Sequence, residues 1–191
     1  MKKSITTLFI IAFLATSCSD MFEKQLDIYE DAIEELDDID DFHSLMNEAL
    51  DTETKISHII AKTSEEDKEE LKKEYGDDYE TIADSVETMR NNYYSEVDKL
   101  FLGYTFNFVE RRILLYQMAA DRYCKTEYIE ELNAIKNIIK RYSLLSFVES
   151  QRSCDPPAKI REEYETKKDL AENCFNVAKK RILDKEAEKE D

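Results

Sequence analysis

Apolar residues recur at helical spacing near the start of the chain. The steps between them are three or four residues, close to a heptad repeat, at Phe22, Leu26, Tyr29, Ile33, Leu36, Ile39, Phe42, Met46 and Ala49. This pattern predicts either one long helix or two collinear helices with a bend near Asp38. Asp40 or Asp41 is suited to begin the second helix, because a carboxylate at an N-cap accepts backbone N–H groups.

A second series of helically spaced apolar residues follows a helix-start signal. Ser64 and Asp67 have the spacing of a capping box. The apolar positions then continue over residues 71–97, and Gly76 inside this stretch is expected to break or loosen the helix. Residues 97–120 are apolar on most of the helical circumference, which is typical of a helix at the centre of a bundle.

The last third of the chain predicts two further helices. Thr126 is suited to cap the first of them, which runs to about residue 148. The prolines at 156–157 stop that helix and can open the next one. After Leu183 the apolar spacing ends, so we expect residues 184–191 to form a charged, flexible tail.

Composition supports a helical fold. The chain of 191 residues has two glycines and two prolines, the residues on which tight turns depend. The sequence therefore predicts an all-α fold, an elongated bundle of four or five long helices with coiled-coil-like packing. It would occupy residues 18–183, with residues 97–148 as its core and the first helix at its periphery.

The residues before the bundle have the organisation of a signal peptide. Lys2 and Lys3 precede an apolar stretch over residues 5–15, and small residues lead from there to Cys18. The stretch is shorter than the roughly 20 apolar residues that a transmembrane helix requires. We therefore expect residues 1–17 to be a cleaved leader.

The residues around this predicted cleavage point, LATSC at 14–18, resemble the lipobox of bacterial lipoproteins. The resemblance implies diacylation of the Cys18 thiol, cleavage after Ser17, and acylation of the new N-terminus. Fatty acyl chains such as palmitate would then hold the protein on a membrane, since each buried methylene contributes about 0.8 kcal/mol. Ser19 follows in place of an aspartate, which favours the outer over the inner membrane; periplasmic and surface exposure both remain open.

Charge is the second strong feature. The chain has 44 acidic and 27 basic residues, a net charge of −17, which would become −19 on loss of Lys2 and Lys3. This composition argues against a nucleic-acid partner and against charge-driven binding to anionic lipid. Residues 20–51 contain thirteen acids and one base, Lys24, whereas residues 110–161 contain seven acids and ten bases.

Two interpretations of the acidic stretch are open. Either it packs beside the basic stretch, or it presents a solvated acidic face to a basic protein. In the second case the candidate contact residues are Asp37, Asp38, Asp40 and Asp41.

Motifs for catalysis are weak. Asp40 and His43 stand three residues apart, but a di-iron bundle needs two Glu-x-x-His motifs, and Lys55 stands three before His58. There is no G-x-S-x-G sequence, and two glycines cannot form a phosphate-binding loop. We therefore expect no catalytic site, no metal and no cofactor.

Three cysteines remain beyond the lipobox. Cys124, Cys154 and Cys174 are an odd number with no C-x-x-C spacing. We expect at most one intramolecular disulfide, with Cys124 and Cys174 the most compatible pair, and favour free thiols.

The sequence as a whole predicts a lipid-anchored helical protein of the cell envelope that acts through protein–protein contact. A first alternative is an envelope immunity or inhibitor protein whose acidic helix blocks a basic partner. A second alternative is a metal-dependent enzyme on a helical scaffold.

Overall fold

The computed structural model describes residues 21–104, 108–150 and 158–190, and this part of the chain contains helices and no strands. The all-α prediction is therefore confirmed. Cys18, the 1–17 leader and Cys154 lie outside the described residues. The helices are α1 (Met21–Glu35), η1 (Leu36–Asp38), α2 (Phe42–Lys62), α3 (Glu65–Tyr75), η2 (Gly76–Asp78), α4 (Tyr79–Gly103), α5 (Phe108–Tyr123), α6 (Ile129–Ser150) and α7 (Ala158–Glu190).

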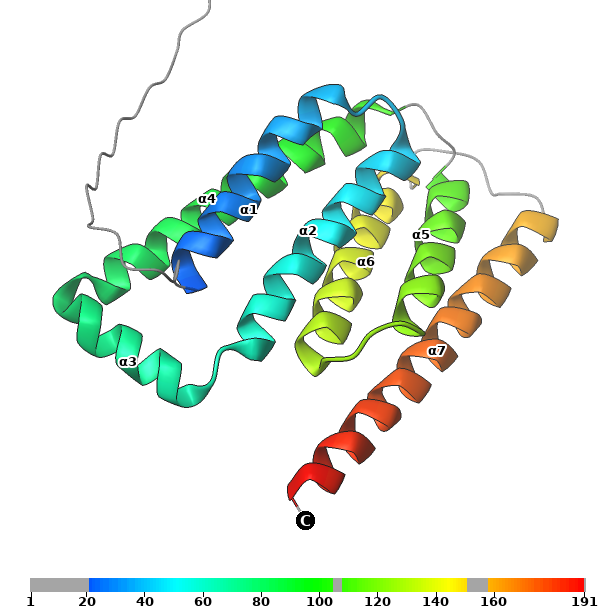
Figure 1. Cartoon of the computed structure of the whole chain (residues 1–191). Coiled ribbons are helices and arrows are strands. Elements are labelled where there is room, and N and C mark those ends of the chain that lie inside the picture. Colours follow the sequence, from blue (N-terminus) through cyan, green and yellow to red (C-terminus); the bar gives the residue numbers. More distant parts are fainter. Residues whose placement is uncertain (1–20, 105–107, 151–157, 191) are drawn as a thin grey trace, which may run out of the picture.

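The first two helices form a hairpin. The chain turns at the 3-10 helix η1, and α2 runs back beside α1 (Figure 1). Asp41 is the N-cap of α2, where its Oδ1 accepts the backbone N–H of Ser44 at 3.0 Å. The cap was predicted, but the collinear arrangement was wrong, because periodicity defines the apolar face of each helix and not the angle between helices.

The helix boundaries on either side of α3 follow the sequence signals. Ser64 and Asp67 form the predicted capping box, with the Asp67 amide donating to Ser64 Oγ at 3.1 Å. Gly76 adopts a φ of 53°, a left-handed conformation that glycine reaches without a steric cost, and it ends α3. A new helix, α4, starts at Tyr79.

The stretch over residues 97–120 is not one central helix. It is divided between α4, which ends at Gly103, and α5, which begins at Phe108. Glycine is among the poorest helix formers, which favours an end at this position. The two parts pack on different partners: α4 on α1, and α5 on α6 and α7. This break and the α1–α2 turn give seven α-helices in the described residues, where four or five were expected.

The core extends through most of the helices. Fully or nearly fully buried side chains include Tyr29 of α1, Leu45 of α2, Phe101 of α4, Leu115 of α5 and Leu132 of α6. The first helix is thus part of the core, and burial is not confined to residues 97–148. The coiled-coil-like packing remains a prediction.

Helix α7 lies at the edge of the bundle and packs mainly on α5, with far less contact to α6 (Figure 1). It continues to Glu190, so the segment expected to be a tail is helical up to that residue. That the bundle domain ends at residue 183 and a separate tail begins at residue 184 remains a prediction. Among the described helices, none is both long and apolar enough to cross a bilayer.

Candidate functional site

The four candidate aspartates lie together at the turn between α1 and α2. Asp37 and Asp38 belong to η1, Asp40 and Asp41 immediately precede α2, and all four are exposed. Among the described residues none of them forms an ion pair. Hydrogen bonds from the Ser44 hydroxyl and amide hold the pKa of the Asp41 carboxyl below its ordinary value. We call Asp37, Asp38, Asp40 and Asp41 the acidic corner.

The acidic and basic stretches pack together through α2, α5 and α6, and an ion pair joins them. Arg122 of α5 donates to Asp51 Oδ1 at 2.6 Å and to Asn47 Oδ1 at 3.1 Å, both on α2. Helix α1, in contrast, packs on α4 and α2. Part of the acidic stretch thus contacts the basic stretch, while the acidic corner stays in solvent.

The histidines have ordinary partners. His43 Nδ1 lies 2.9 Å from the Asn47 amide nitrogen, one helical turn away. His58 Nε2 lies 3.3 Å from Glu131 Oε2, and its ring contacts the edge of Tyr128. In the described part of the chain, no three residues of metal-binding type converge.

Cys124 and Cys174 are brought together as the most compatible pair. Their Sγ atoms are 3.9 Å apart and both thiols are free, whereas a disulfide bond measures about 2.05 Å. Cys124 is exposed and Cys174 is partly buried, and this burial raises the pKa of the Cys174 thiol. The two thiols lie at the end of α5, where α7 passes it.

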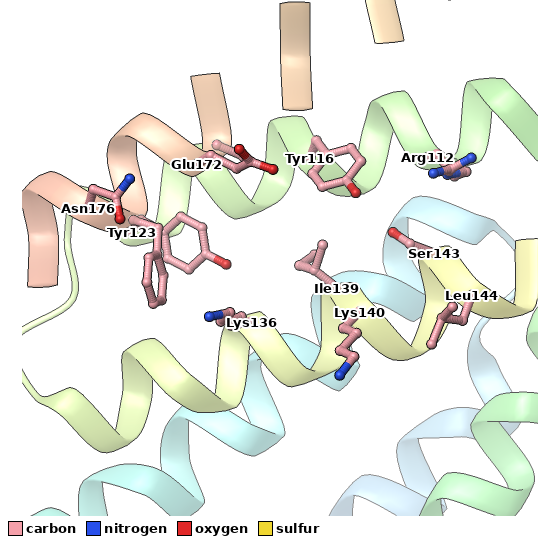
Figure 2. A pocket seen from close by; sticks show the side chains of 12 residues that line it. Arg112, Tyr116, Tyr123, Lys136, Ile139, Lys140, Ser143, Leu144, Glu172 and Asn176 are labelled. Carbon is pink, nitrogen blue, oxygen red and sulfur yellow. The ribbon is translucent and has the colours of Figure 1, made fainter. Parts of the chain in front are cut away.

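A pocket of about 630 Å³ lies between α5, α6 and α7 (Figure 2). We call it the groove. It exists because α7 packs on α5 and leaves α6 largely uncovered on this side. Its lining residues are Arg112, Tyr116, Tyr123, Lys136, Ile139, Lys140, Ser143, Leu144, Ala171, Glu172, Phe175 and Asn176.

Two of the cations that line the groove contact aromatic rings. The Arg112 guanidinium stacks on Tyr164 with its carbon 4.4 Å from the ring centroid and donates to the Tyr164 hydroxyl. Lys136 Nζ lies 4.5 Å from the centroid of Phe175, whose ring meets Tyr123 edge-on at 5.4 Å. Burial raises the pKa of Tyr164 to about 12, so its hydroxyl is neutral at physiological pH.

Sequence reasoning missed the groove, although part of it was visible. Lys136, Lys140 and Ser143 follow one another at steps of four and three, which places them on one face of α6. What the sequence does not show is that α7 packs against α5, which leaves that face of α6 open.

Comparison with known proteins adds no name to these features. No protein-family model, no curated protein and no solved structure matches the chain.

Proposed function

We propose that the chain is a lipid-anchored helical protein of the bacterial cell envelope that acts by binding another protein rather than by catalysis. The anchor would be Cys18, and the outer membrane its location. The partner would carry a basic surface. A basic toxin or enzyme that this chain inhibits would be such a partner.

The acidic corner is the observation that supports binding. Four carboxylates project from one turn without ion pairs to the described residues, although basic side chains elsewhere on the chain pair with acids, as Arg141 does with Asp98 at 2.5 Å. At physiological ionic strength the field of such a cluster extends about 8 Å. It would therefore act on a partner that is already close, and raise its association rate more than its final affinity.

The anchor is tested by metabolic labelling with palmitate. We expect label in the wild type and none in Cys18→Ala, with the wild type in the membrane fraction. Equal labelling of both proteins would contradict the anchor and leave the binding proposal to its own test.

The binding role is tested on the partner that the tethered protein captures from its native envelope. Replacing Asp37, Asp38, Asp40 and Asp41 by Asn removes four charges, and Asn at position 41 remains a good N-cap. We expect slower association, with a weaker dependence of the rate on salt. A control removes four exposed charges from around α3 instead, through Glu66→Gln, Glu70→Gln, Glu74→Gln and Asp77→Asn.

Two outcomes would contradict the role of the acidic corner. One is an unchanged association rate at low salt. The other is an equal loss in the α3 control, which would mean that only net charge matters.

A further inference from the structure

We propose that the groove between α5, α6 and α7 binds a small organic anion that has a carboxylate head and an apolar body of one or two rings. This site is independent of the acidic corner, which lies at the α1–α2 turn.

The charge of the groove is the first argument. Arg112, Lys136 and Lys140 line it, and none of them forms an ion pair with a carboxylate of the described residues. The chain has an excess of acids, and other cations use them: Arg122 pairs with Asp51. The groove also carries one exposed carboxylate, that of Glu172, so three cations outnumber one acid and leave an excess of positive charge that an anion complements.

A buried hydroxyl is the second argument. Ser143 is 8% exposed and lines the groove, yet its Oγ has no hydrogen-bond partner in the described residues. Three residues later on the same helix, Ser146 donates to the carbonyl of Tyr142 at 2.8 Å. Buried hydroxyls are almost always satisfied in this way or by ordered water, and a ligand oxygen in the groove would take the place of that water.

The unsatisfied groups locate the head of the ligand. The buried Nε of Arg112 also lacks a partner, and Figure 2 shows Arg112 and Ser143 at one end of the pocket, with Tyr123 and Asn176 at the other. A carboxylate at this end would accept from both groups, and hydrogen bonds to charged donors are the stronger class.

The other end of the groove suits an apolar body. Ile139 and Ala171 are buried and line the groove together with the rings of Tyr123 and Phe175. Aromatic rings prefer edge-on or offset contacts with other rings, which a planar body can adopt here. The volume is within the range of about 300–1,000 Å³ for small-molecule sites. The exposed carboxylate of Glu172 lines the same side as these rings and would direct the anionic head away from itself, toward Arg112.

The test compares two ligands of the same shape. Full-length protein in a non-ionic detergent is titrated by calorimetry with 2-naphthoate and with 2-naphthamide, which replaces the carboxylate by a neutral amide. We expect one molecule of 2-naphthoate per chain, bound about tenfold more tightly than 2-naphthamide, because only the acid meets the cations with a charge.

Two groove variants and one matched control then locate the site. Lys140→Gln and Ser143→Ala should each weaken 2-naphthoate about three- to tenfold and change 2-naphthamide less. Lys179→Gln removes the same charge from an exposed position of α7 outside the groove and should leave both affinities unchanged. Thermal unfolding checks the fold, and Ser143→Ala should be as stable as the wild type or more so, since it removes an unsatisfied hydroxyl.

Three results would overturn the proposal. The first is the absence of saturable 2-naphthoate binding up to about 1 mM. The second is equal affinity for the acid and the amide. The third is a loss of 2-naphthoate affinity in Lys179→Gln as large as the loss in Lys140→Gln.

Discussion

Two clusters in the molecule combine an arginine with tyrosine, and they differ in what completes them. Between α1, α2 and α4, Glu53 accepts from the hydroxyl of Tyr29 at 3.0 Å and lies 3.8 Å from Arg90. At one end of the groove, Arg112 stacks on Tyr164 and donates to its hydroxyl, but no carboxylate of the described residues pairs with this guanidinium. The first cluster is closed by the chain's own acid, and the second is open.

The difference separates a structural cluster from a binding site. A buried charge whose counter-charge lies in the same fold is compensated, and removing that counter-charge destabilises the fold. A buried hydroxyl and a guanidinium nitrogen without partners reduce stability, and such groups have a use when a ligand satisfies them. The comparison therefore assigns the α1–α2–α4 cluster to folding and the groove to recognition.

The largest expected effect on stability comes from comparing substitutions on the two sides of helix α6. Leu132 is fully buried, whereas Leu144 lines the groove and is 54% exposed. Leu132→Ala should lower the free energy of unfolding by about 3 kcal/mol through lost burial and a cavity. Leu144→Ala should change it by less than about 0.5 kcal/mol. Urea unfolding measures both, and a large loss for Leu144→Ala would mean that the groove side of α6 is covered.

Removal of the acid from the closed cluster should have the next largest effect. Glu53→Ala leaves the hydroxyl of Tyr29 without its acceptor and takes one of two carboxylates from Arg90, which keeps Glu87 at 3.6 Å, and we expect a loss of about 2 kcal/mol. Glu53→Gln keeps an acceptor and should lose less. Urea unfolding is again the measurement, with Glu66→Gln as an exposed control. If Glu53→Ala were as stable as that control, the cluster around Glu53 would have no role in stabilising the fold.

Oxidation should link α5 and α7 at the end of the groove that lies away from Arg112. Cys124 follows Tyr123 and Cys174 precedes Phe175, and both ring residues line the groove. A mild oxidant should join the two Sγ atoms, which must approach from 3.9 Å, and stabilise the fold by about 1–2 kcal/mol.

A Cys154→Ser background leaves these two thiols as the intramolecular pair to be followed. Non-reducing peptide mapping identifies the bridge, and unfolding measured with and without reductant gives its effect. Two free thiols after oxidation, counted in the denatured state, would show that the helices hold the sulfurs apart.

The smallest effect appears only at high pH. Burial, with the charge of Glu53 adding to it, raises the pKa of Tyr29 well above its ordinary value of 10.0. A raised pKa in the folded state stabilises the fold fully below pH 10, and this contribution is lost as the pH rises through the folded-state value. We expect stability to fall above pH 10, and to fall less steeply in Tyr29→Phe.

The matched variant in the open cluster is Tyr164→Phe. Tyr164 has a pKa of about 12 in the folded state, a smaller shift than that of the more deeply buried Tyr29. Up to pH 11 both variants should change the pH dependence about equally, because only the unfolded-state tyrosine ionises in that range. The two should separate only as the pH rises past 12, where Tyr164 ionises in the folded protein as well. Urea unfolding from pH 8 upward makes the comparison, and a smaller change in Tyr164→Phe already below pH 11 would contradict a folded-state pKa of about 12.

Local signals in the sequence predicted local structure. The capping box at Ser64, the cap at Asp41 and the break at Gly76 each depend on groups within a few residues. The hairpin of α1 and α2 and the division of residues 97–120 depend on which distant helix each apolar face meets, which periodicity does not encode. The acidic corner could be predicted because it is a run of charged residues in the sequence. The groove could not, because it depends on the packing of α7 on α5.

The packing of α2 on α6 has a consequence for the order of synthesis. The apolar face of α2, with Leu45 and Leu50, is buried against helices that include one made much later in the chain. A ribosome working at about 5–20 residues per second needs on the order of 3–13 s for residues 63–128, which separate the two helices. During that interval the apolar face of α2 lacks the α6 surface that covers it in the folded protein.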